Sequence, residues 1–320
     1  MQSENVVVYA GVDVAKATLQ VHLQGRQSEF ANSPTGLCLL TKHLQKVAGV
    51  HVVCEATGGY EQTMVKVLHA AQIPVSVVNP AQVRAAAQAQ GQRAKSDPID
   101  ALGLSDYGRR YEPKTTPPVS QTQERLVALT QWLKQLVSGL AMAKTQAEHH
   151  QNPFVRRQHA KLLVHLESQT KAVETEIQKL LQEDNALQQR VDCLDSIQGV
   201  GARTAWLVQA HMPELGKINR QQAAALAGLA PWTRESGTMK GKRCIGGGRS
   251  EVRVALYMAA LSAARSNPVM RDLYKRLRAK EKPAKVALTA VMRRLLTFMN
   301  HKLKNLNAQT AAKEIVEAIA

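Results

Sequence analysis

Apolar residues near the start of the chain fall in short runs, which is typical of β-strands. Three such runs lie at about 5–13, 17–23 and 27–31, and only a few residues separate each from the next. Short connections of this kind join antiparallel neighbours. The pattern therefore predicts a three-stranded antiparallel meander.

Helical and strand patterns alternate after this meander. Ser33-Pro34 begins a helical pattern that ends near Leu44, and an apolar run follows at 50–55. A second helical pattern spans 60–71, and another apolar run spans 73–78. Three antiparallel strands followed by this alternation is the order of the ribonuclease-H-like fold, with a mixed sheet between helices.

The middle of the chain carries two helical seams. After a linker pattern at 115–118, leucines recur from Leu126 to Leu140 at spacings of three and four, and a second seam spans 162–180. Asn152-Pro153 separates the two. They predict an antiparallel hairpin or a dimerising coiled coil, and two helices buried in one bundle are the alternative. Since the chain beyond Leu194 is helical, we expect three parts, at 1–115, 116–190 and 191–320.

Charge points to the class of partner. The 320 residues contain 42 Lys and Arg against 25 Asp and Glu, a formal net charge of +17. So positive a chain is expected to bind a polyanion, with nucleic acid the first candidate. Aromatic residues make up only 4%, which favours phosphate contacts over base stacking.

Other features exclude several classes of protein. The four cysteines are scattered and form no C-x-x-C pair, so neither a zinc knuckle nor a disulfide framework is expected. The sequence starts without a targeting pattern and has no apolar run of transmembrane length. We expect a reduced, soluble, cytosolic protein with no membrane partner.

Four carboxylates in the first third stand out. Asp13 interrupts an apolar strand pattern, Glu55 closes another, and Asp97 and Asp100 stand three residues apart at a helix start. Such a set is typical of Mg²⁺ sites for phosphoryl chemistry. The alternative for the last pair is structural, with Asp97 as an N-cap followed by Pro98. The alternative for Glu55 is that it is a solvated residue at the end of a strand, with no role in metal binding.

A loop rich in glycine and cations spans 231–249. Ser236 precedes Gly237 in it, where its hydroxyl would be accessible as a nucleophile, and neighbouring cations would stabilise charge on phosphorus. The alternative is a flexible, solvated loop. The residues expected to contact phosphates come from this loop, from Arg253 shortly after it and from a basic run at 271–285: Arg234, Lys242, Arg243, Arg249, Arg253, Arg271, Lys275, Arg276 and Arg278.

A glycine-containing turn at 197–205 has two interpretations. Its shape is that of a helix-hairpin-helix turn, whose backbone amides and following helix would face a phosphate. An ordinary turn between two helices is the alternative.

Taken together, these segments resemble a known family. The sequence is similar to the DEDD-type transposases of bacterial insertion sequences, which are bridge-RNA-guided recombinases. The resembling segments cover nearly the whole chain in order: 11–16, 54–60, 79–84, 94–101, 227–231, 235–237, 245–253, 255–261 and 267–268. Departures are mild, with Ser96 where Thr is common and Pro98 after the first Asp of the last pair.

The resemblance implies a RuvC-like N-terminal domain whose acids, here Asp13, Glu55, Asp97 and Asp100, bind Mg²⁺. It also implies a C-terminal domain whose serine, here Ser236, attacks DNA. Implied partners are double-stranded donor and target DNA, a structured bridge RNA, and further copies of the chain in a dimer or tetramer. We expect the acids and the serine to meet in a composite site between protomers.

Two other functions stay open at this point. The first is a metal-dependent, structure-selective nuclease, like a Holliday-junction resolvase, which forms no covalent intermediate. The second is a non-catalytic nucleic-acid-binding protein, whose function would not depend on Mg²⁺.

Overall fold

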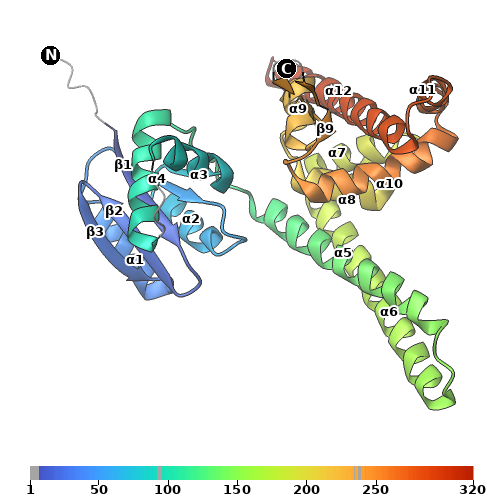
Figure 1. The fold of residues 1–320 in the computed structure, drawn as a ribbon, viewed down its shortest axis with the longest axis horizontal. Helices are drawn as coiled ribbons and strands as arrows, with labels where there is room; N and C mark the ends of the chain where they lie inside the picture. The colour runs from blue at the N-terminus through green and yellow to red at the C-terminus, as the bar shows by residue number, and fades with distance from the viewer. Residues whose placement is uncertain (1–6, 92–95, 234, 237–238, 242, 320) are drawn as a thin grey trace. The chain divides into compact units, whose positions relative to one another are not determined.

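A computed structural model describes residues 7–91, 96–233, 235–236, 239–241 and 243–319. The chain divides into two compact units, Met1–Val119 and Ser120–Ala320 (Figure 1). No helix in these described ranges is both long and apolar enough to cross a membrane.

A five-stranded mixed sheet forms the centre of the first unit, in the order β3-β2-β1-β4-β5. The meander is confirmed, because β1 (Val8–Val14), β2 (Thr18–Leu23) and β3 (Arg26–Ala31) pair antiparallel. The strands β4 (Val50–Glu55) and β5 (Val75–Val78) then add in parallel on the other side of β1. This arrangement agrees with the ribonuclease-H-like order expected from the sequence.

Helices cover both faces of this sheet. On one face α1 (Pro34–Leu44) and α2 (Glu61–Ala70) pack Leu40 and Met64 against the inward side chains of β1, β2 and β4. On the other face lie α3 (Pro80–Ala89) and α4 (Asp97–Tyr111), and α4 packs mainly against β1 and β2 (Figure 1). Two cores thus enclose the sheet, as its alternating apolar pattern requires.

The predicted linker is held by the edge of the sheet. The Thr116 amide donates to the Val75 carbonyl at 2.8 Å, and the Thr116 hydroxyl accepts from the Val77 amide at 2.9 Å. Ser76 Oγ also lies 2.9 and 3.0 Å from the carbonyl oxygens of Lys114 and Pro113. Residues 113–116 therefore cover the exposed edge of β5, and edges of this kind are otherwise prone to pair with another chain.

A long antiparallel hairpin opens the second unit. It consists of α5 (Gln121–Ala147) and α6 (Pro153–Glu183), which lie side by side (Figure 1). Asn152 caps α6 and Pro153 opens it, so the predicted break is confirmed. Leu126 and Leu133 share one hydrophobic core with the helices that follow, so the seam is buried within the chain at this end.

Six further helices complete that core. They are α7 (Asn185–Asp195), α8 (Ala202–His211), α9 (Arg220–Leu226), α10 (Ser250–Ser266), α11 (Pro268–Ala279) and α12 (Ala284–Ile319). The glycine turn before α8 contains Gly199 with φ +97°, and a Cβ there would lie 2.5 Å from the Ala263 backbone. Close packing against α10 explains this glycine, which supports the interhelical-turn interpretation.

The segment 231–249, expected to be a loop rich in glycine and cations, contains short strands between the helices. Two short ribbons form there: β6 (Pro231–Trp232) pairs with β9 (Cys244–Ile245), and β7 (Glu235–Ser236) pairs with β8 (Met239–Lys240). Proline and several glycines disfavour a helix in this segment, and hairpin pairing satisfies the backbone instead.

Candidate functional site

Asp13 and Glu55 occupy neighbouring positions on one face of the sheet. The parallel pairing of β1 and β4 ends with Val12 opposite Cys54, so the two acids are the next residues on adjacent strands. Val12 and Cys54 face the core beneath α1 and α2. Because side chains alternate along a strand, both acids face the α4 side. Each is half-buried.

The direction of α4 brings its first turn toward this end of β1. A Cβ on Gly11 would lie 2.0 Å from the Ala101 carbonyl oxygen, so α4 touches the strand backbone there. Seven residues later along the helix, a Cβ on Gly108 would lie 2.6 Å from the ring of Tyr9. The helix therefore runs antiparallel to β1, with its N-terminus toward Asp13.

Asp97 and Asp100 lie in that first turn of α4. Ser96 holds the N-cap position and its carbonyl accepts from the Asp100 amide at 2.8 Å. The alternative that made Asp97 the N-cap is therefore wrong by one residue. Asp97 is exposed and Asp100 is half-buried. A helix N-terminus also favours negative charge, which stabilises acids at these positions.

The four acids share one end of the unit without forming a closed cluster. Among the residues that the structure describes, no three His, Cys, Asp or Glu side chains are grouped closely enough to hold a metal ion. Their chemistry suits a hard divalent cation, which prefers carboxylate oxygens. A metal bound by these four side chains stays a prediction.

Cys54 precedes Glu55 on β4 and does not add a ligand to the acids. Burial, with smaller effects from the charges of Glu61 and Glu55, raises the pKa of the Cys54 thiol to about 12. The thiol is therefore neutral at physiological pH, whereas metal binding requires the thiolate.

Glu61 organises the loop that follows Glu55, a role that the sequence pattern did not predict. One carboxylate oxygen accepts from the Thr57 amide, the Thr57 hydroxyl and the Gly59 amide, at 3.1, 3.0 and 2.9 Å. Gly58 and Gly59 supply the positive φ angles of the turn, +71° and +112°. In the sequence, the only indication of this turn was the Gly58-Gly59 pair followed closely by Glu61.

A polar row continues from Asp13 across the meander. The register places Gln20 opposite Asp13 and Glu29 opposite Gln20, on the same face of the sheet. The Gln20 amide donates to the Glu29 carboxylate. Glu29 is thus a further carboxylate on the α4 side. It carried no signal in the sequence, because it lies on an edge strand whose residues are mostly polar.

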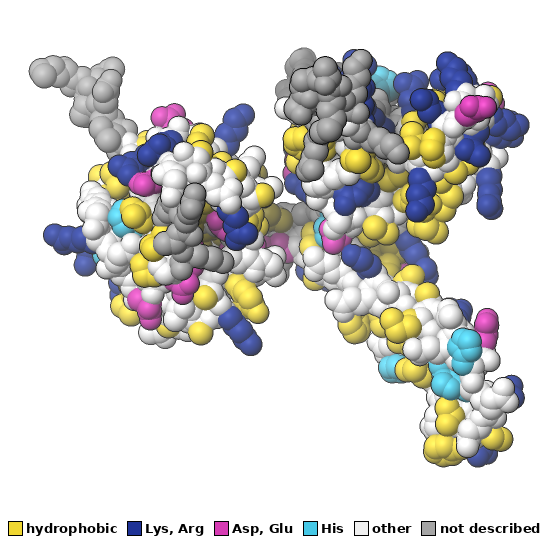
Figure 2. Space-filling view, in the orientation of Figure 1, with side chains coloured by type: hydrophobic (Ala, Val, Ile, Leu, Met, Phe, Trp, Pro, Cys, Tyr) yellow, Lys and Arg dark blue, Asp and Glu magenta, His cyan; other side chains and the backbone are white. Residues whose placement is uncertain are grey.

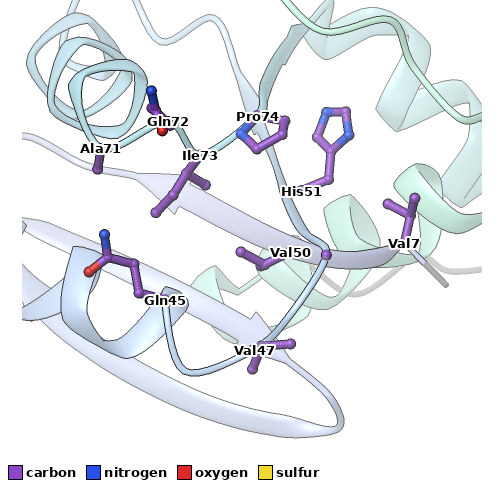
Figure 3. Close-up of a pocket in the computed structure, with 10 residues that line it drawn as sticks. Val7, Gln45, Val47, Val50, His51, Ala71, Gln72, Ile73 and Pro74 are labelled. Carbon is purple, nitrogen blue, oxygen red and sulfur yellow. The ribbon is translucent and has the colours of Figure 1, made fainter. Parts of the chain in front are cut away.

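The cavity in Figure 3 lies at the opposite end of the sheet. It measures about 530 Å³ and opens where β4 and β5 begin, between Val50, Ile73 and Pro74. His51 lies on its wall, and His51 Nε2 is 2.8 Å from Ser76 Oγ. Burial lowers the pKa of this histidine. The described lining contains no carboxylate, so this cavity is separate from the acids at the strands' carboxyl ends.

Ser236 stands in a β-hairpin. Its backbone lies in β7 opposite Met239 of β8, and Glu235 lies opposite Lys240. Arg234, Gly237 and Lys242 lie outside the described residues. The strand pairing places Ser236 at the end of β7, and the nucleophilic role of its hydroxyl stays a prediction.

Two of the arginines expected to contact phosphates make hydrogen bonds at the base of this loop. Arg249 donates two hydrogen bonds to the Glu214 carboxylate, at 2.6 and 2.7 Å. Arg253 donates to the Gly247 carbonyl at 2.6 Å. Burial, the largest single effect, raises the pKa of Glu214. The hydrogen bonds from Arg249, a backbone hydrogen bond and the Arg249 charge together outweigh burial and hold that pKa below its ordinary value.

The other described cations of the prediction are exposed. Figure 2 shows Lys and Arg side chains gathered over α11, where Arg271, Lys275, Arg276 and Arg278 lie. Arg278 also donates to the Lys282 carbonyl at 2.6 Å. Arg243 is exposed beside β9. These side chains are accessible to a phosphate backbone.

Comparison with known proteins covers both parts of the chain. Residues 10–152 match a family model described as a transposase, of the DEDD type found in IS110 elements. Residues 191–275 match the model described as "Transposase IS116/IS110/IS902 family". The first match contains Asp13, Glu55, Asp97 and Asp100, and the second contains Ser236.

Three curated relatives extend this likeness. The chain is 29% identical to the pilin gene-inverting protein of Moraxella bovis, over 91% of this chain and 94% of that protein. The corresponding protein of Moraxella lacunata is 28% identical over the same shares. An uncharacterized 43.6 kDa protein of insertion element IS110 from Streptomyces coelicolor is 30% identical, over 46% of this chain and 36% of that one.

Proposed function

Because the chain belongs to the IS110 family of DEDD transposases and is a DNA recombination enzyme, we propose that it cuts and rejoins DNA strands through Ser236 with the help of its N-terminal acids. The adjacent positions of Asp13 and Glu55, on the face toward which the first turn of α4 points, carry this proposal. The Moraxella relatives are named for inverting a pilin gene, a rearrangement in which DNA is cut and rejoined.

The acids would hold Mg²⁺, which supplies positive charge beside the reacting phosphate when bound. Asp13 and Glu55 lie on rigid strands and would fix one side of this site. Asp97 and Asp100 lie on α4 and would complete it. Carboxylates that converge on one site repel one another, so a bound cation would favour their approach.

Ser236 would attack the scissile phosphate. A bond forms between Ser236 Oγ and phosphorus while the bond from phosphorus to the 3′ oxygen breaks. The hydroxyl proton leaves, and the 3′ oxygen departs as a hydroxyl. Attack by a different 3′ hydroxyl on the phosphoserine then rejoins the strand and returns the proton to serine, so the phosphodiester bond energy is conserved.

Sequence choice would be left to base pairing. We propose that a structured bridge RNA pairs with double-stranded donor and target DNA, and that a dimer or tetramer of the chain holds them. The net charge of +17 and the few aromatic residues support a protein that contacts nucleic-acid phosphates and does not itself recognise the base sequence.

Denaturing electrophoresis tests this mechanism. The protein is incubated with its element's RNA, labelled DNA and Mg²⁺, and the wild type is expected to yield a covalent protein–DNA band. Ser236→Ala should bind DNA but yield no adduct, while the control Ser266→Ala, an exposed serine of α10, should react like the wild type. Free cleaved ends without an adduct would instead identify the hydrolytic nuclease. Binding without any cleavage would identify the non-catalytic protein.

A further inference from the structure

A groove of about 520 Å³ lies between the β6–β9 ribbon and the start of α12. Resting on the proposed function, we propose that this ribbon groove binds an unpaired segment of the DNA strand next to the phosphate that is cut. No family match or relative assigns a ligand to it. Its volume falls in the range of about 300–1,000 Å³ that is typical of small-molecule sites.

Apolar side chains form the two walls of the ribbon groove. Leu229, Pro231 and Ile245 line the ribbon side, where Pro231 and Ile245 are paired across the two strands. Val286 and Ala290 line the α12 side, four residues apart and hence on one face of the helix. Val286 is 52% exposed and Ile245 is 37% exposed, so both offer apolar surface to a ligand.

Three cations line the same groove. Lys285 and Arg293 lie on α12 in the row that also holds Thr289, and Arg243 lies across from them beside β9. No carboxylate is among the described lining residues, and within the described part of the chain no acid forms an ion pair with these three cations. Lys285 and Arg293 are two helical turns apart, about 12 Å, so they would engage separate phosphates of one strand.

Apolar walls beside cations fit an unpaired strand better than a duplex. A duplex presents phosphates at its surface and keeps its base faces stacked inside, so it would leave the groove walls unused. An unpaired nucleotide offers both a base face and a phosphate. The apolar walls also favour deoxyribose, because a 2′-hydroxyl buried against them without a partner is costly.

The chain order indicates which strand enters. The segment between β6 and β9 contains β7 with Ser236, and Trp232 and Glu235 are separated by two residues. A strand whose phosphate reaches Ser236 therefore continues near the base of the same loop. Local unpairing beside the cut would let the strand ends exchange partners, as the proposed function requires.

Charge removal tests the phosphate contacts. Binding of a labelled oligothymidylate is measured against salt for wild type, for Lys285→Gln/Arg293→Gln and for the matched control Arg156→Gln/Arg157→Gln, two exposed arginines of α6. The groove variant should lower the log–log salt slope by about 1.4, since each phosphate engaged on a single strand contributes about 0.7. An unchanged slope would overturn the proposal.

Filling the groove tests the apolar contacts without altering charge. Ala290→Phe should weaken oligothymidylate binding at least tenfold with the salt slope preserved, while Ala312→Phe, an exposed position of the same helix, should have no effect. The loss should be larger for oligothymidylate than for a DNA duplex or an oligouridylate of equal length. Equal losses for the duplex, or tighter binding of the RNA through these residues, would overturn the assignment to unpaired DNA.

The two proposals fail separately in these experiments. If the wild type forms the Ser236 adduct but the groove variants bind oligothymidylate normally, the groove proposal is wrong and the mechanism stands. If no adduct forms while the groove variants lose oligothymidylate binding, the groove is a DNA site and the serine mechanism is wrong. Circular dichroism melting of every variant shows whether the fold is retained.

Discussion

Glu61 and Thr57 are joined by two hydrogen bonds, from the amide and from the hydroxyl of the threonine to one oxygen of the carboxylate. Together with the Gly59 amide they hold the loop that leaves β4 directly after Glu55. Glu61 is therefore a positioning residue for the candidate site, although it lies on α2.

Removing the Glu61 carboxylate should loosen this loop. Glu61→Ala leaves three donors without their acceptor, and a hydrogen bond to a charged group contributes about 1.5–3 kcal/mol. Because the half-buried donors of Thr57 and Gly59 can bind water in the variant, we expect less than the sum, a loss of about 2–4 kcal/mol in the free energy of unfolding. Glu61→Gln keeps an acceptor oxygen and should lose less. Urea denaturation measures both, with the exposed Glu112→Gln as control. A Glu61→Ala protein as stable as the wild type would show that the loop needs no such support.

Gly11 should tolerate no side chain. A Cβ there would lie 2.0 Å from the Ala101 carbonyl oxygen and 2.4 Å from the Ser105 nitrogen, so α4 would have to move away from β1. Gly11→Ala is expected to cost about 2 kcal/mol or more of stability, in the range of overpacked cores. Gly103→Ala is the matched control on α4, because open space surrounds it; there alanine should stabilise by up to about 1 kcal/mol. Thermal unfolding compares the two.

Asp13 should be needed for catalysis and for the response to metal. Mg²⁺ or Mn²⁺ is expected to raise the melting temperature of the wild type by relieving repulsion among the acids, and Asp13→Asn should respond much less. Asp13→Asn should also abolish strand exchange while DNA binding persists. Strand exchange at the wild-type rate in this variant would remove Asp13 from the site.

Exposed and paired cations should differ in their salt dependence. Lys275→Gln/Arg276→Gln on α11 should lower the salt slope of duplex DNA binding, by up to about 0.9 for each phosphate that is no longer neutralised. Arg249→Gln should leave that slope unchanged, because its guanidinium already pairs with Glu214. A lower slope in the Arg249 variant would show that DNA displaces this ion pair.

Acid should weaken the contact between Glu214 and Arg249. The folded pKa of Glu214 lies below its ordinary value, so the contribution to stability is present above the unfolded pKa and is lost as pH falls through the folded one. Glu214→Gln should therefore differ from the wild type most at neutral pH and converge with it in acid. Urea midpoints across this range provide the measurement, and a gap that persists below the folded pKa would contradict the assignment.

The order of elements was predictable because it depends on local pattern. The alternation of apolar and polar residues within β1 to β3 depends only on residues close together in the sequence. The same is true of the Asn152-Pro153 break between α5 and α6. Asp13 and Glu55 were recognisable for the same reason, as acids at places where a strand pattern expects apolar residues. Their shared face follows from the register of two parallel strands.

Contacts between distant residues were not predictable in this way. Arg249 pairs with Glu214 across 35 residues, so a cation that looks available in the sequence is already engaged in the fold. The approach of α4 to β1 depends on Gly11 and Gly108, which carry no periodic signal. Strands of two residues, such as β6 and β9, are too short to show an alternation at all.

The pairing of β6 with β9 joins the two ends of the segment that contains Ser236. Its two ends meet at Pro231 and Ile245, so the segment enters and leaves the helical core at one place. Changing the length of such a closed loop costs little, about 0.6 kcal/mol for each doubling. Changes in the number of residues between β6 and β9 are therefore expected to cost the helical core little stability.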